Sequence, residues 1–152
     1  IKSEIYHSYS KKVVFIEDYA FLINALNDLY DNTLNFKYKD LASKLAKEAI
    51  TKFYIKNKNF FQKNQINNND AFYNPVDIGD NTIPNGNAIM LINFVKLGMM
   101  DDAKKLSDSL NGYLNIYKSH MMTALRAIDF FNNIKDGKNC NEQGCKIDVK
   151  KD

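Results

Sequence analysis

Residues 85–97 decide the fold, and they read Asn-Gly-Asn-Ala-Ile-Met-Leu-Ile-Asn-Phe-Val-Lys-Leu. Apolar side chains fill nearly every position of this stretch, so a helix formed here has no polar side. Such a helix is buried against several neighbours. Pro84 fixes the backbone before it, Asn85 can cap it, and Gly98 can end it. We therefore expect residues 85–97 to form the central helix of an all-α domain.

Four amphipathic segments surround this central helix, and each repeats apolar residues at steps of three and four. Residues 17–33 and 37–54 precede it and are joined by a short link, which predicts an antiparallel helical hairpin. Residues 101–117 and 119–132 follow it, and one of the two leading aspartates can cap the first of these. The predicted inward stripes are Tyr19, Leu22, Ile23, Leu26, Leu29 and Tyr30; Leu41, Leu45, Ala46, Ala49, Ile50 and Phe53; Ala103, Leu106, Leu110, Tyr113, Leu114 and Tyr117; and Met122, Leu125, Ile128, Phe130 and Phe131.

Residues 56–81 interrupt the helical rhythm with asparagine, lysine and glutamine, punctuated by four aromatic side chains. We expect a long loop here, or a short β-hairpin whose strands carry those aromatics; loops of this length are often functional. The aromatics are Phe60, Phe61, Phe72 and Tyr73. The predicted organisation is a helical domain over residues 1–135 and a polar tail over residues 136–152.

Composition excludes several classes of protein. The chain has 152 residues, of which 45% are hydrophobic and 26% charged, as in a folded single domain. Its 21 Lys and Arg against 18 Asp and Glu give a net charge of only +3, and Arg126 is the sole arginine. Nucleic-acid binding relies on an excess of positive charge and on arginine side chains, and this chain has little of either. We therefore expect no nucleic-acid partner.

Nothing in the sequence predicts a membrane segment or a secretory leader. The longest mostly apolar stretch, Ala88 to Met100, is shorter than the roughly 20 residues that cross a bilayer. No basic and then apolar leader is visible, and a first residue other than Met suggests that Ile1 is not the natural start. Two cysteines are too few for a disulfide framework, so we expect a cytoplasmic protein.

Three motifs go beyond periodicity. Residues 16–23 read Ile-Glu-Asp-Tyr-Ala-Phe-Leu-Ile, residues 80–87 read Asp-Asn-Thr-Ile-Pro-Asn-Gly-Asn, and residues 140–145 form Cys-x4-Cys. Their order and spacing resemble a family that joins an N-terminal thioredoxin-like domain to a C-terminal six-hairpin, (α/α)6 domain, as in the spermatogenesis-associated protein 20 group. Asn85 stands where that family has serine.

The resemblance implies that this chain is the C-terminal part of a larger protein and forms only part of a helical toroid. Five helices cannot close a ring of six hairpins. The remaining helices would come from the missing N-terminal half of the parent protein or from another copy of the chain. By analogy with such toroids, the resemblance implies binding or processing of a carbohydrate, of an epimerase or glycosidase type. A non-catalytic helical interaction module is the alternative.

Three carboxylates are the candidate catalytic residues. The resemblance places Glu17 or Asp18 with Asp80 at the mouth of the toroid, where paired carboxylates could act as acid and base on a sugar. Side chains of adjacent helical residues point about 100° apart, so at most one of the first two faces a cavity comfortably. The structural alternative is that both acids favour the positive end of a helix.

The segment before the central helix supplies the candidate substrate-binding residues. Asn85, Gly86 and Asn87 bring backbone NH groups and short polar side chains to a helix start, which can hold a hydroxyl or an anion. The compatible structural alternative is a tight, capped helix entry. Tyr19 in the first motif and His120 at a later helix start complete the candidates, although a lone histidine is more often structural.

Cys140 and Cys145 are candidate redox residues, as a small disulfide loop, as free thiols or as a redox pair. Zinc would need two further ligands, and only His7 and His120 are present, both remote in sequence. We therefore expect no metal and no cofactor.

Overall fold

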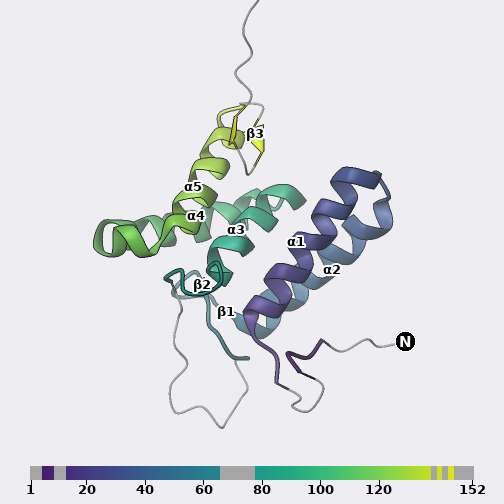
Figure 1. Cartoon of the computed structure of the whole chain (residues 1–152), viewed down its shortest axis with the longest axis horizontal. Coiled ribbons are helices and arrows are strands. Elements are labelled where there is room, and N and C mark those ends of the chain that lie inside the picture. The colour runs from purple at the N-terminus through teal and green to yellow at the C-terminus, as the bar shows by residue number, and fades with distance from the viewer. Residues whose placement is uncertain (1–4, 9–12, 66–77, 138–139, 142–143, 146–152) are drawn as a thin grey trace, which may run out of the picture.

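The structure is a computed structural model that describes residues 5–8, 13–65, 78–137, 140–141 and 144–145. Within these residues the chain is mostly helical, which confirms the all-α prediction (Figure 1). The helices are α1 (Ile16–Thr33), α2 (Phe36–Phe53), α3 (Gly86–Leu97), α4 (Met100–Tyr117), the 3-10 helix η1 (Lys118–His120) and α5 (Met122–Lys135). The strands are β1 (Tyr54–Ile55), β2 (Phe60–Phe61), β3 (Cys140–Asn141) and β4 (Gly144–Cys145).

Helices α1 and α2 form the predicted antiparallel hairpin. Leu34 ends α1 in the left-handed conformation, with φ 55°, and its NH donates to the Tyr30 carbonyl at 2.7 Å. Asn35 then caps α2, because its side chain accepts from the NH of Lys37 at 3.1 Å. The link is only two residues long, so the two helices must pack side by side.

Helix α3 is central, as its apolar sequence predicts. Ten of its twelve residues, from Gly86 to Val95, are buried. Asn85 caps it by accepting from the NH of Ala88 at 3.1 Å, and Gly98 ends it at φ 73°. Helices α1, α4 and α5 all pack against α3, with the α1–α2 hairpin at the right of Figure 1 and α4 and α5 at the left.

Helices α1 and α3 run in the same direction. A Cβ on Gly86 would meet Glu17, so both helices begin at the same place. Midway along, the side-chain NH2 of Asn93 donates to the Ala20 carbonyl at 2.8 Å. Toward their ends, the Lys96 ammonium pairs with Asp28 at 2.7 Å. The N-terminal ends of α1 and α3 therefore share one edge of the molecule.

A short hairpin follows α2 and lies partly outside the predicted range. β1 pairs with β2 in antiparallel register, Tyr54 opposite Phe61 and Ile55 opposite Phe60. The predicted aromatics Phe60 and Phe61 are on this hairpin, whereas residues 72 and 73 lie outside the described residues.

Several predicted inward positions are wrong. Leu22, Leu29 and Leu41 are 39–44% exposed, and four residues near the α4–α5 junction are as exposed or more so. These four are Tyr113, Tyr117, Met122 and Leu125. Alanines outside the predicted stripes are fully buried instead, and such small side chains let helix axes approach: these are Ala20, Ala42, Ala124 and Ala127. The predicted aspartate cap is also wrong, since α4 begins at Met100 and both aspartates lie inside its first turn.

Across the described part of the chain, no helix has both the length and the apolar character needed to cross a bilayer.

Candidate functional site

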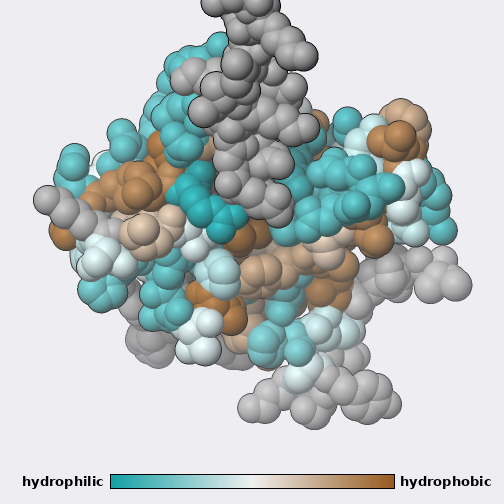
Figure 2. Space-filling model, turned by 45° about the horizontal axis from the view of Figure 1, so that its top comes forward, coloured by the Kyte–Doolittle hydropathy of each residue, from teal (hydrophilic) through white to brown (hydrophobic). Residues whose placement is uncertain are grey.

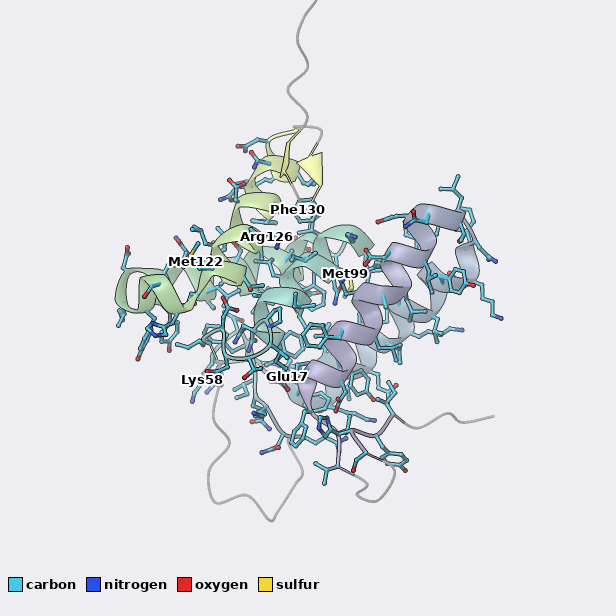
Figure 3. All side chains as sticks on the ribbon, in the orientation of Figure 1. Glu17, Lys58, Met99, Met122, Arg126 and Phe130 are labelled. Carbon is cyan, nitrogen blue, oxygen red and sulfur yellow. The ribbon has the colours of Figure 1, made fainter. Side chains whose placement is uncertain are left out.

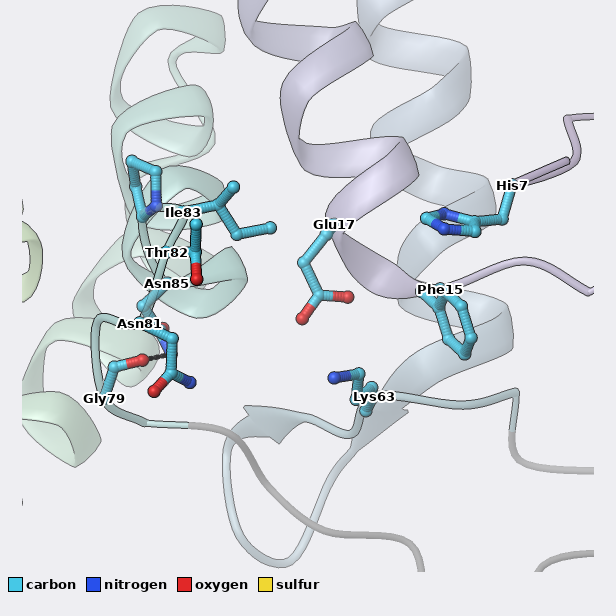
Figure 4. A pocket seen from close by; sticks show the side chains of 10 residues that line it. His7, Phe15, Glu17, Lys63, Gly79, Asn81, Thr82, Ile83 and Asn85 are labelled. Atoms are coloured by element: carbon cyan, nitrogen blue, oxygen red, sulfur yellow. Dashed lines mark hydrogen bonds between the residues drawn. The ribbon is translucent and has the colours of Figure 1, made fainter.

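A pocket of about 310 Å³ opens at the edge where α1 and α3 begin (Figure 4). One wall consists of His7, Phe15, Glu17 and Lys63. The loop before α3 forms the other wall, through residues 79 and 81–85. The pocket thus brings together the first motif, which opens α1, and the second, which opens α3.

Glu17 is the predicted acidic residue that faces this pocket. It is the second residue of α1, and its carboxylate points into the pocket, into the space between the loop before α3 and Lys63 (Figure 4). Gly86 packs against the start of α1, since a Cβ there would lie 3.3 Å from Cγ2 of Ile16 and 3.4 Å from Cγ of Glu17. The Lys63 ammonium points into the same space and lies 5.8 Å from the centre of the Phe15 ring. The pocket therefore holds a carboxylate and an ammonium group on one wall.

Asp18 has a structural task at the start of α1. Its Oδ2 accepts from the NH of Phe15 at 2.9 Å, and its Oδ1 lies 2.9 Å from Nδ1 of His7. The first contact caps the helix and the second holds the N-terminal segment against it. Asp18 does not line the pocket, so the structure places only one of the adjacent acids there.

Asp80 joins the starts of two helices. Its Oδ1 accepts from the NH of Asn85 at 3.0 Å, and its Oδ2 accepts from the NH of Thr123 at 2.8 Å. Its own NH donates to the His120 carbonyl at 2.6 Å. The carboxylate therefore positions the beginnings of α3 and α5, and it lies behind the loop that forms the pocket wall.

Asn85 and Asn87, both predicted to bind substrate, differ in their surroundings. Asn85 lines the pocket and caps α3 at the same time. Asn87 is 1% exposed, and its side-chain amide binds the backbone of β2: Oδ1 accepts from the Phe61 NH at 2.8 Å, and Nδ2 donates to the Phe61 carbonyl at 3.0 Å. Asn87 therefore holds the β-hairpin against α3.

Tyr19 lies between α1 and α2, away from the pocket. It is 1% exposed, and its hydroxyl donates to Glu48 at 2.7 Å and accepts from Lys52 at 3.0 Å. Burial raises the pKa of the Tyr19 hydroxyl, and the hydrogen bond from Lys52 lowers the pKa of Glu48. Burial alone would lower the pKa of Lys52, but its hydrogen bonds to Glu48 and Tyr19 raise it overall. The cluster ties α1 to α2.

The remaining candidates lie elsewhere. His120 is exposed in η1, with Nδ1 3.3 Å from the Ser119 hydroxyl, and only its backbone reaches Asp80. Cys140 and Cys145 lie on β3 and β4, beyond the C-terminal end of α5. The structure thus brings together Glu17 and Asn85 at one pocket, with Gly86 behind them.

Sequence reasoning missed Lys63, Phe15 and the loop residues Asn81 and Thr82 as pocket residues. Lys63 reaches the pocket because its carbonyl accepts from the NH of Ile16 at 3.1 Å, beside an isolated β-bridge between Phe15 and Asn64. Such pairing between distant segments leaves no local pattern. A lysine in a polar stretch carries no signal of its own.

Within the described residues, no group of three or more His, Cys, Asp or Glu side chains is placed to hold a metal ion. The chain matches no protein-family model, and it matches none of the curated proteins compared with it. The family resemblance therefore stays a prediction based on its three motifs.

Proposed function

We propose that the pocket between α1 and the loop before α3 binds a polyhydroxylated ligand of the sugar class. The observation that carries this proposal is the position of Glu17, whose carboxylate points into the pocket between the polar loop of residues 81–85 and Lys63. Concave sites of this size, with an apolar lining and a few convergent polar groups, are the usual form of small-molecule sites.

The chemistry of the walls favours hydroxyl groups as ligands. A hydroxyl both donates and accepts, and the pocket offers an acceptor in Glu17, a donor in Lys63 and both kinds of group in the Asn81 amide. Phe15 and Pro84 supply apolar surface beside these groups, which suits the CH faces of a sugar ring.

Binding is proposed without glycoside hydrolysis. Most glycosidases use two carboxylates that flank the scissile bond. Glu17 is the one carboxylate that lines the described part of this pocket. Asp18 uses its two oxygens on Phe15 and His7, and Asp80 uses its two oxygens on the NH groups of Asn85 and Thr123. Any acid–base step on the ligand, such as an epimerisation, would fall to Glu17 with Lys63 beside it.

The toroid remains part of the proposal. Helices α1 and α5 pack on α3, while α2 packs on α1, and α4 packs on α3 and α5. Asp80 brings the start of α5 to the start of α3, so all three of α1, α3 and α5 begin near one edge. This is the layering expected of an arc of an (α/α)6 ring, with the pocket at one rim.

Titration with a panel of neutral mono- and disaccharides, followed by chemical-shift changes in NMR spectra, tests the binding proposal. Glu17→Gln should weaken the binding of the best sugar by about tenfold, since it replaces a charged hydrogen-bond acceptor with a neutral one. Asp101→Asn is the matched control, because Asp101 is also the second residue of its helix and is exposed. Its affinity should equal that of the wild-type chain.

The same titration can also contradict the sugar-binding proposal. If no sugar of the panel shifts the resonances of the pocket, or if Glu17→Gln binds as tightly as Asp101→Asn does, the pocket is not a sugar site.

An interaction module is a second candidate, favoured by one apolar surface. Ile116, Tyr117, Met122 and Leu125 are 47–70% exposed around the α4–α5 junction, and we call these four residues the α4–α5 surface. Figure 2 shows apolar residues gathered over this end of the molecule (left), and Figure 3 places Met122 there. In a ring of hairpins, the next helix, from the parent protein or another copy, would cover this flank.

Sedimentation velocity over a wide range of protein concentration tests this second candidate. The wild-type chain should associate with increasing concentration, and the double substitution Met122→Lys/Leu125→Lys should abolish association, since charges cannot be buried there without partners. Leu34→Lys is the control, because Leu34 is 71% exposed in the α1–α2 link, far along the sequence from this surface. A wild-type chain that stays monomeric throughout contradicts self-association through this surface.

A further inference from the structure

The two cysteines of the chain occupy opposite positions in a small β-hairpin. β3 pairs with β4 in antiparallel register, with Cys140 opposite Cys145 and Asn141 opposite Gly144. Directly opposite residues of an antiparallel pair have Cα atoms about 4.5–5.5 Å apart. Disulfides bridge Cα atoms that are about 4.4–6.8 Å apart, so this register needs no backbone movement to join the two residues.

We propose that Cys140 and Cys145 form a reversible cross-strand disulfide, which makes the β3–β4 hairpin a redox site. The oxidant is a low-molecular-weight disulfide such as oxidised glutathione. One cysteine thiolate attacks it and releases one reduced glutathione, and the second cysteine then attacks the mixed disulfide and releases another. Two protein thiols are oxidised to one disulfide while one glutathione disulfide is reduced to two thiols.

The number of suitable ligands favours a disulfide over a bound metal. A structural zinc site needs four ligands, usually Cys or His, whereas the chain has two cysteines and only two histidines, His7 and His120, which lie far from the cysteines in sequence. Gly137, at φ 75°, lies just after α5, and β3 packs against that helix. A disulfide between Cys140 and Cys145 would close a loop of six residues, 140–145. Because β3 packs against α5, this loop would lie beside the C-terminal end of that helix.

Equilibration of the full chain in glutathione buffers of increasing oxidised fraction tests the proposal. Samples are quenched with an alkylating reagent and analysed by intact mass spectrometry and peptide mapping. Both thiols should disappear together, in monomers, with the loss of two hydrogens and a cross-linked peptide containing Cys140 and Cys145. A reducing buffer should restore both thiols.

Two variants test whether disulfide formation depends on the register of β3 and β4 or only on the short separation of the two cysteines in sequence. In Cys145→Ser, the remaining Cys140 should carry one glutathione as a mixed disulfide. In Cys140→Ser/Asn141→Cys, one thiol moves out of register, and the ratio of internal disulfide to dithiol at a fixed buffer composition should fall about tenfold.

Any of four results overturns the proposal. These are alkylatable thiols at every buffer composition, disulfides only between copies, internal disulfide formation in the shifted variant equal to that of wild type, and thiols protected by a stoichiometric metal ion.

Discussion

Replacing Asn87 with alanine should lower the free energy of unfolding by about 3 kcal/mol, since two buried backbone groups would each lose a partner at roughly 1–3 kcal/mol apiece. The reason lies in the register of the β-hairpin. Gln62 donates to Phe53 across the hairpin, so the next pair, Tyr54 and Phe61, is of the non-hydrogen-bonded kind. The NH and carbonyl of Phe61 therefore need a partner elsewhere, and the Asn87 amide supplies it.

Urea denaturation measures this loss. Asn85→Ala is the comparison variant, because Asn85 lies two residues away and caps the same helix, a contact usually worth about 1 kcal/mol. If Asn87→Ala lowers the free energy of unfolding no more than Asn85→Ala does, the Phe61 backbone finds other partners. The hydrogen bonds from the Asn87 amide would then not be the main support of the hairpin.

Removing the carboxylate of Asp80 should cost about 2–3 kcal/mol in Asp80→Ala, since charge-assisted bonds to two backbone NH groups disappear at once. Asp80→Asn should cost about half as much, because its single amide oxygen can serve only one of the two NH groups. Both variants can be compared with wild type by urea denaturation, together with hydrogen exchange at the amides of Asn85 and Thr123.

The pair of variants also separates the two roles considered for Asp80. If the residue supports the helix starts, folded Asp80→Asn should keep most of the wild-type sugar affinity. A variant of unchanged stability that no longer acts on a sugar would instead favour the catalytic interpretation from the sequence.

Much of the fold could be predicted because its signals are local. The all-round apolar sequence of residues 85–97 indicated the central helix, and Asn85 and Gly98 cap its two ends as expected. The inward stripes were less predictable. Helical spacing gives a face, but it does not say whether an alanine or a leucine sits at the closest contact. Ala124 and Ala127 are buried on α5, while Leu125 remains exposed between them.

The site was predictable only where two motifs meet. Glu17 and Asn85 do line one pocket, but the sequence could not separate Glu17 from Asp18, because either acid stabilises a helix start. The choice depends on how α3 packs against the start of α1, where Gly86 lies beside Ile16 and Glu17. Lys63 was not predictable, since it reaches the pocket through a bridge between segments about 50 residues apart.

The two bonds that Asp80 accepts have a thermodynamic consequence for the whole rim. One bond holds the loop of the pocket, and the other holds the first turn of α5, which carries Met122. Two equilibria that share one anchor are linked, and linkage is reciprocal. Under the proposed function, a ligand that stiffens the loop should therefore also oppose fraying of α5, and a chain that packs against the α4–α5 surface should in turn raise the affinity of the pocket for that ligand.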